Sequence, residues 1–223
     1  MIDNSFKLTP TDFAAIASKD ANYLLEKGAT FYNGGQYHLA IEYYLLAASM
    51  GNDIALSNLG YCYLYGRSIP INVSLAVAYF KLAVEKRNCD AAYKLGNIYS
   101  SDKWDLKDTE LSTYYYSLAA SFIMGDDWFL TDSILWCSEL QEYPSLCYAL
   151  GIQMSQNGNM GTNSDRSYQF LKHAELGYQK ELENGHMFYE NSLQGVQKLL
   201  ANSFYDSVRE LYDRQFDEYK LNR

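Results

Sequence analysis

Residues 55–83 read ALSNLGYCYLYGRSIPINVSLAVAYFKLA, and this stretch decides the fold. It contains two runs of apolar residues at the spacing of an amphipathic helix, the first around Leu59 and the second around Phe80. The linker between them, Gly66 to Pro70, has the composition of a turn. The stretch therefore predicts a hairpin of two helices, in which glycine and alanine let the two backbones approach closely.

The same pattern recurs along the chain. The dipeptide Leu-Gly occurs at 59–60, 95–96 and 150–151. Each of these glycines is followed by a small residue at offset 16, a bulky pair at offsets 19 and 20, and an alanine at offset 23. An earlier unit that starts at Gly28 keeps this order with a tighter turn. Because a single helix hairpin cannot bury its outer face, we predict that neighbouring units stack.

The second unit carries the most complete pattern: Ala55, Leu59, Gly60, Tyr63, Gly66, Ile69, Asn72, Ala76, Tyr79, Phe80 and Ala83. This pattern resembles the Sel-one-like repeat (SLR) family. The third unit departs from it with Ser101 and Asp102 where the linker glycine is expected, and the fourth has Met154 in place of the helix tyrosine. The first unit is more similar to a tetratricopeptide repeat (TPR). The resemblance implies an all-α fold, a right-handed α-solenoid of antiparallel helix pairs.

We predict one α-solenoid domain over 1–223. Its predicted parts are an N-terminal capping helix (1–19), a TPR-like repeat (20–52), two SLRs (53–88 and 89–125), an inserted helix (126–144), a degenerate SLR (145–185) and a C-terminal capping or assembly helix (186–223).

The spacing of the glycines and the helix-cap signals predict the structure of the insert and of the two ends. Gly96 lies 36 residues beyond Gly60, but Gly151 lies 55 beyond Gly96, and the roughly nineteen extra residues carry their own apolar set. At the N-terminus a hydroxyl cap, a proline and an acid signal a helix start. Apolar residues at helical spacing predict one long helix from 186 to 219. It is either a cap on the array or an assembly helix for homo-oligomers, and a break near Asn202 would favour the cap.

The charge pattern bears on the partner. The net charge is −9, and residues 91–223 carry 19 acids and 11 bases, whereas residues 1–90 carry eight acids and seven bases. Nucleic acids and anionic membranes are bound by Lys/Arg-rich faces, so neither is expected as the partner. A basic protein partner fits the acidity, but so does acidity that only confers solubility. With no run of apolar residues typical of a signal peptide or a membrane span, the sequence reads as cytoplasmic.

No motif in the sequence points to catalysis, and we expect no catalytic residue, cofactor or metal. There is no phosphate-binding glycine loop, zinc-protease motif or nucleophile elbow. The four cysteines are scattered and read as small buried hydrophobes, and the three histidines stand far from them. We expect His173 to pack at a joint between repeats.

In the family that the sequence resembles, the first helix of each unit lines a concave surface that binds partners. Nine residues at the remaining offsets of the first helices are our candidates: Ser57, Tyr61, Tyr65, Tyr93, Asn97, Ser101, Tyr148, Ile152 and Gln156. Tyrosine with Asn, Ser and Gln makes an adaptable binding surface, although these aromatic residues could instead pack between adjacent helices. The predicted function is an adaptor that holds a protein or peptide partner. The alternative is an immunity-type inhibitor that neutralises a basic toxin or enzyme.

Overall fold

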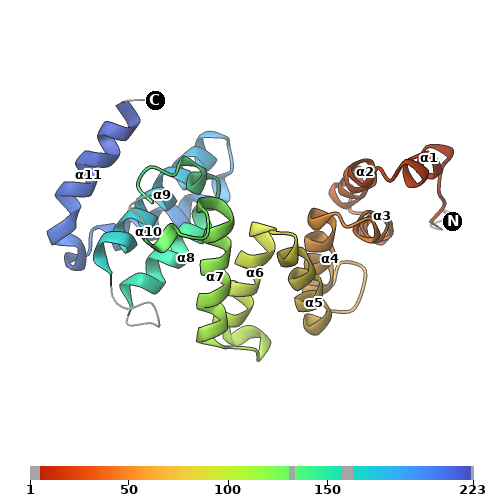
Figure 1. Cartoon of the computed structure of the whole chain (residues 1–223), viewed down its shortest axis with the longest axis horizontal. Helices are drawn as coiled ribbons and strands as arrows, with labels where there is room; N and C mark the ends of the chain where they lie inside the picture. The colour runs from red at the N-terminus through yellow and green to blue at the C-terminus, as the bar shows by residue number, and fades with distance from the viewer. Residues whose placement is uncertain (1–5, 131–133, 157–162, 222–223) are drawn as a thin grey trace. The chain divides into compact units, whose positions relative to one another are not determined.

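A computed structural model describes residues 6–130, 134–156 and 163–221. Over these residues the chain forms eleven α-helices and five short 3-10 helices, and it contains no β-strand (Figure 1). The predicted all-α fold of antiparallel helix pairs is therefore confirmed. Contacts divide the chain into two compact units, Met1–Leu106 and Lys107–Arg223. The division falls inside the repeat predicted over 89–125, whose first helix belongs to the first unit and whose second helix belongs to the second unit.

The first unit is built from helix hairpins. Its helices are α1 (Pro10–Ser18), α2 (Ala21–Asn33), α3 (Tyr37–Ser49), α4 (Asp53–Tyr65), α5 (Val73–Glu85), α6 (Cys89–Ser100) and the 3-10 helix η1 (Asp102–Trp104). Helix α2 packs against α3 and α4 packs against α5, while α3–α4 and α5–α6 contacts join consecutive pairs. Helix α1, at the position of the predicted N-terminal cap, packs on α2.

Glycine at the predicted positions allows the close approach within each hairpin. A Cβ atom added to Gly60 would lie 2.7 Å from the ring of Phe80 on the paired helix. At Gly28 the same atom would lie 2.7 Å from the ring of Tyr44. The bulky residue of the second helix thus occupies the space of the missing side chain on the first. The alanine three residues further on, Ala83 in the second hairpin, is fully buried in the same contact layer.

Asparagine caps connect one repeat to the next. The side chain of Asn52 caps α4 by accepting from the Ala55 amide at 2.8 Å, and Asn88 caps α6 by accepting from Ala91 at 2.8 Å. Asn88 also donates to the carboxylate of Asp53 at 2.7 Å, one repeat earlier. A cap satisfies a backbone amide that the helix leaves unpaired, so each of these residues stabilises both its own helix and the joint between repeats.

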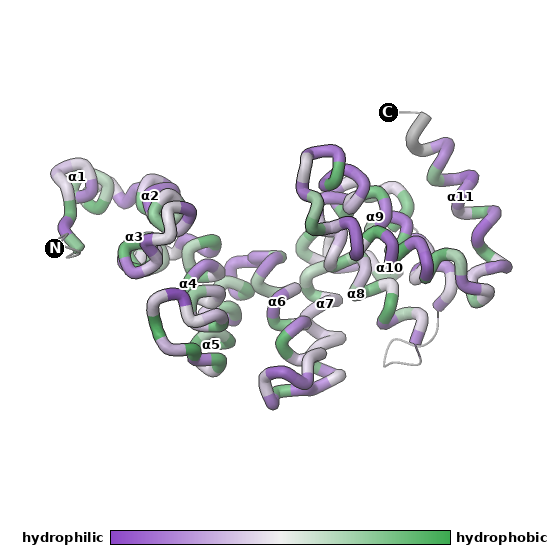
Figure 2. The backbone as a smooth tube through the Cα atoms, turned by 180° about the vertical axis from the view of Figure 1, so that it is seen from behind, coloured by the Kyte–Doolittle hydropathy of each residue, from purple (hydrophilic) through white to green (hydrophobic). Residues whose placement is uncertain are grey.

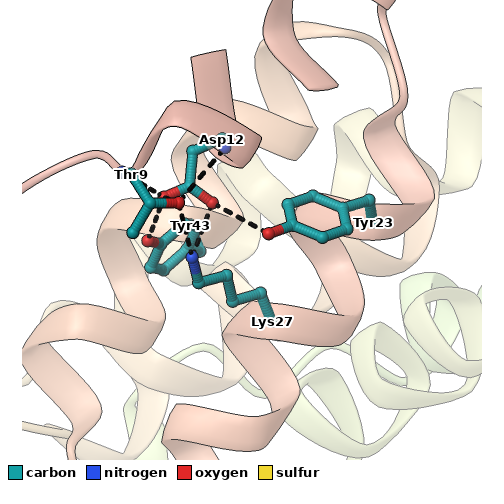
Figure 3. A network of polar contacts seen from close by, with 5 residues as sticks. All are labelled: Thr9, Asp12, Tyr23, Lys27 and Tyr43. Carbon is teal, nitrogen blue, oxygen red and sulfur yellow. Dashed lines mark hydrogen bonds and ion pairs between the residues drawn. The ribbon is translucent and has the colours of Figure 1, made fainter. Parts of the chain in front are cut away.

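Asp12 fastens α1 to the first hairpin (Figure 3). Its fully buried carboxylate accepts hydrogen bonds from the amide and hydroxyl of Thr9 and from the hydroxyls of Tyr23 and Tyr43, and it forms an ion pair with Lys27 at 2.6 Å. Burial raises the pKa of Asp12, but the hydrogen bonds from Lys27, Thr9 and Tyr43 outweigh it and hold the pKa well below its usual range. The carboxylate is therefore ionised at neutral pH.

The second unit is organised around one hairpin. Its α-helices are α7 (Thr109–Met124), α8 (Pro144–Ser155), α9 (Ser164–Glu183), α10 (Glu190–Leu200) and α11 (Asp206–Leu221). Helices α8 and α9 pair at the position of the degenerate SLR, and α7, α10 and α11 pack on this pair. A Cβ atom added to Gly151 would lie 2.7 Å from the side chain of Leu171, so the glycine contact of the first unit recurs here.

The segment predicted as an inserted helix, 126–144, does not form an α-helix over its described residues. Two short 3-10 helices, η2 (Trp128–Leu130) and η3 (Ser138–Glu142), stand in its place, and 131–133 lie outside the described residues. The physical reason is that its carbonyls bond to side chains of the next hairpin. The Ile134 carbonyl lies 2.6 Å from Nε2 of His173, and the Leu140 carbonyl accepts from the Cys147 thiol at 3.3 Å. His173 is fully buried, and its contacts are with the insert and with Phe216 of the C-terminal helix rather than with a neighbouring repeat.

The long C-terminal helix predicted over 186–219 is interrupted. After the 3-10 helix η4 (Met187–Tyr189), α10 ends at Leu200, Asn202 caps the 3-10 helix η5 (Ser203–Tyr205), and α11 follows. Helix α11 folds onto α9, where Tyr168 donates to Asp213 at 2.9 Å. Figure 2 shows that most of α11 is hydrophilic, in keeping with a helix that buries only one side. Both the break near Asn202 and this packing favour the cap over the assembly helix.

Candidate partner-binding site

Five of the nine predicted partner-binding residues come together in the first unit. Tyr61 and Tyr65 lie on α4, Tyr93 and Asn97 lie on α6, and Ser101 follows α6 directly and caps η1. The rings of Tyr61 and Tyr65 are stacked, with centroids 6.2 Å apart and planes 13° apart. The predicted offsets thus select side chains that two successive first helices present on one surface.

A lysine that the sequence analysis did not select stands at the centre of this surface. The ammonium of Lys94 lies 5.0 Å from the ring centroid of Tyr61 and 5.9 Å from that of Tyr93. Both are within the range of cation–π contacts, and the shorter one, to Tyr61, is the stronger. The pKa of Tyr61 is raised, chiefly by burial and further by the charge of Asp90, which places this acid near the same rings.

The surface contains a hollow of about 330 Å³ where α4, α6 and η1 meet. Its lining comes from the ends of α4 and α6 and from η1: Leu64, Tyr65, Lys94, Asn97, Ile98, Ser100, Ser101, Lys103 and Trp104. We call it the α4/α6 hollow. Its volume is at the lower end of the range of ligand pockets, which suits a few side chains of a bound peptide.

A second lysine of the hollow, Lys103, also lies against an aromatic ring, and apolar side chains form part of the walls. The ammonium of Lys103 lies 4.3 Å from the ring centroid of Trp104. Ser101 accepts the Lys103 amide at 3.1 Å, so its hydroxyl hydrogen is left to donate elsewhere. Tyr65 is 44 % exposed, whereas Leu64 and Ile98 are buried below the surface. A bound segment would therefore meet charged, polar and aromatic groups within one small area.

The other four predicted residues do not join this surface. Ser57 is only 4 % exposed, because its position on α4 turns the side chain into the core, so it cannot contact a partner. Tyr148, Ile152 and Gln156 lie on or directly after α8, in the second unit. Tyr148 is half-buried with its hydroxyl toward Gly195 of α10, which matches the alternative that such aromatics pack between helices.

The second unit has a hollow of its own that the repeat pattern did not predict. It measures about 510 Å³ and is mostly apolar, with walls from Tyr114 and Leu118 of α7, Trp128 and Phe129 of the insert, and Met154 of α8. Charges of opposite sign, Asp126 and Arg166, also line it. The insert is unique to this point of the array, so no comparison between repeats could have revealed a hollow here.

The residues missed in the first unit carry a weak sequence signal. Lys103 and Trp104 lie in the linker of the third repeat, where Ser101 and Asp102 replace the expected glycine. This departure from the repeat pattern indicates that the linker has a role besides reversing the direction of the chain. Lys94 carries no such signal, because its position two residues before Gly96 lies between the offsets considered.

Two of the four cysteines are fully buried, as expected of small hydrophobic residues. Cys62 and Cys147 are fully buried, whereas Cys89 and Cys137 are half-buried. Burial raises the pKa of the Cys62 thiol to about 11 and that of Cys89 to about 12. Both thiols are therefore protonated at neutral pH and poor nucleophiles.

The helix hairpins and their glycine contacts make this chain a helical-repeat protein. The Sel1 repeat family model matches residues 17–52, 53–88, 89–121 and 144–178, together 140 of the 223 residues. The chain belongs to the Sel1 repeat family, whose members generally act in protein–protein interaction.

Two solved structures are similar to this chain. A Sel1 repeat protein from Oxalobacter formigenes is 26 % identical over 48 % of this chain and 84 % of its own, with a TM-score of 0.43. A protective antigen of uropathogenic Escherichia coli strains with an SLR fold is 18 % identical over 92 % of this chain and 52 % of its own, with a TM-score of 0.46. No curated protein matches the chain. Among the described helices, none combines the length and apolar character that crossing a membrane requires.

Proposed function

We propose that this chain is a protein-binding adaptor whose α4/α6 hollow holds a peptide segment of its partner. The observation that carries the proposal is that Tyr65, Asn97 and Ser101 line that hollow. Tyr61 and Tyr93 contact Lys94, which also lines it. Tyrosine and tryptophan next to small polar groups are the composition of adaptable binding surfaces. Binding of this kind needs no catalytic group, and we infer that the chain is not itself an enzyme.

The test compares two exposed aromatic residues of the first unit. Tyr65 lines the hollow, whereas Phe13 on α1 is 60 % exposed and lies outside it. In pulldowns from native lysate we expect the Tyr65→Ser variant to lose partners that the wild type and the Phe13→Ser variant retain. Both variants should keep the helical circular dichroism of the wild type, because neither side chain is in the core. Equal recovery of partners by all three proteins would contradict the proposal.

The immunity-type inhibitor is the second candidate, and the charge distribution is the observation that favours it. Residues 107–223 carry 17 acids and 9 bases, so the second unit presents a net charge of −8 to a cationic partner. An inhibitor of this type would bind one partner in a stoichiometric, tight and salt-sensitive complex. That complex would also survive the Tyr65→Ser change. Several weaker partners that depend on Tyr65 indicate the adaptor.

A further inference from the structure

The charge of the α4/α6 hollow is opposite to that of the whole chain. Two lysines, Lys94 and Lys103, contribute to its lining, and no Asp or Glu does. The first unit as a whole is nearly neutral, with ten acids and nine bases over residues 1–106, so the excess of acids lies in the second unit and not around the hollow. The chain has a net charge of −9, but the lining of this hollow carries two positive charges.

Both ammonium groups lie against aromatic rings, and among the described residues neither forms an ion pair. Lys94 lies over the rings of Tyr61 and Tyr93, and Lys103 lies over Trp104. Among the described residues, neither lysine has a carboxylate oxygen within 4 Å. Other basic residues do, among them Lys27, Lys172, Lys180 and Arg214. Burial raises the pKa of Asp90, one turn before Lys94 on α6, and the charge of Lys94 offsets part of this rise, although the two residues form no ion pair.

A ring face satisfies an ammonium only in part. It attracts the charge but accepts none of the three N–H bonds in the way that an oxygen does. Each lysine therefore keeps donors for an anionic group, and part of its side-chain entropy has already been lost to the ring contact, which lowers the cost of binding. Ser101 adds a hydroxyl donor beside them.

We propose that the α4/α6 hollow recognises an acidic peptide segment: Asp or Glu side chains bind Lys94 and Lys103, and a neighbouring aromatic or aliphatic side chain packs against Tyr65. This inference deepens the proposed function and rests on it. It reverses the expectation of a basic partner for this site, because local charge decides what a small hollow binds, whereas net charge acts at long range and is screened within about 10 Å at 0.1 M salt.

The experiment selects heptapeptides from a random display library on the full-length protein. The inference predicts enrichment of sequences in which Asp or Glu stands next to an aromatic or aliphatic residue. The Tyr65→Ser protein serves as the selection control, because it removes the exposed aromatic wall and keeps both lysines. A selected peptide is then made with an amidated C-terminus and a fluorescent label, and its affinity is measured by fluorescence polarisation.

Three single variants test the two lysines against a matched control. Hydrogen bonds to charged groups are strong enough that Lys94→Gln and Lys103→Gln should each weaken binding about tenfold or more. Lys81→Gln removes the same charge from an exposed position of α5 outside the hollow, and it should change the affinity by less than about twofold. Replacing the acids of the peptide by Gln or Asn should abolish most of the binding in the wild type.

The outcomes separate this inference from the proposed function. Enrichment of Lys- or Arg-rich peptides, or an affinity that Lys94→Gln and Lys103→Gln leave unchanged, overturns the acidic specificity while peptide binding in the hollow stands. If no peptide is enriched on the wild type above the Tyr65→Ser control, both the specificity and the binding role of the hollow are wrong.

Discussion

Gly177 lies where α9 crosses the insert, and replacing it by alanine gives the sharpest test of the packing described above. A Cβ atom there would lie 2.5 Å from the carbonyl oxygen of Gln141 and 2.9 Å from Cβ of Pro144. Neither atom can rotate away, because one belongs to the backbone of η3 and the other to the proline ring that starts α8. The segment must therefore shift as a whole.

The magnitude follows from two opposing effects. Alanine in a helix interior is favoured over glycine by about 1 kcal/mol. Overpacking a buried contact costs about 1–3 kcal/mol, and a clash with backbone belongs at the upper end of that range. We expect Gly177→Ala to lower the free energy of unfolding by about 2 kcal/mol. At about 4 °C per kcal/mol for a unit of this size, the melting temperature should fall by about 8 °C.

Gly195 supplies the matched control. It also lies in a helix interior, that of α10, but the nearest atom to an added Cβ is the Tyr148 hydroxyl at 3.8 Å, an ordinary contact. Gly195→Ala should therefore raise the free energy of unfolding by about 1 kcal/mol. Both variants are compared with the wild type by urea titration and thermal melting, followed by circular dichroism. Equal shifts of the two variants in the same direction would refute the packing argument.

Three further predictions concern the first unit. Gly60→Ala should destabilise the chain by about 1 kcal/mol in urea titrations, and Phe80→Leu in the same chain should remove most of the clash, so the two changes together should cost less than their sum. Asp12→Asn should cost about 3 kcal/mol at pH 7, since it leaves Lys27 unpaired. Because the folded pKa of Asp12 is lowered, its contribution is complete above the unfolded pKa of about 4, and the difference between wild type and variant should shrink as the pH falls below that value. Cys62 should react with a thiol reagent at pH 8 far more slowly in the native protein than in urea, and equally fast labelling would contradict its burial.

The hairpins of this fold could be predicted because their decisive contacts are written at fixed distances along the sequence. Gly60 and Phe80 are twenty residues apart, and Gly151 and Leu171 repeat that separation with the same close contact. The repeat thus reports a three-dimensional contact without any knowledge of the structure. Sequence periodicity also selected Tyr61, Tyr65, Tyr93, Asn97 and Ser101, since residues at equal offsets on stacked helices come to lie on one surface.

The insert shows where such reasoning fails. An α-helix was inferred from its own set of apolar residues, because apolar residues at helical spacing usually indicate one. Here the carbonyls of Ile134 and Leu140 accept backbone amides of the short 3-10 turns and also contact His173 and Cys147, which follow 39 and 7 residues later. A segment with such partners does not need a helical backbone, and no local pattern announces them.

The charge of the α4/α6 hollow could not be predicted from the sequence for a related reason. A count of charges along the chain is dominated by residues 107–223, which hold 17 of the 27 acids, and so it was compatible with a basic partner or with acidity that only confers solubility. The lining of the hollow includes Lys94, from a first helix of the repeat, and Lys103, from a linker that departs from the repeat. An average over the chain gives these two residues no special weight. Only the fold brings both lysines and Tyr65 to one hollow, and these side chains set the sign of the charge at its wall. Charge counts are therefore informative about the long-range field of each unit, while the specificity of a small site depends on which side chains the helices bring together.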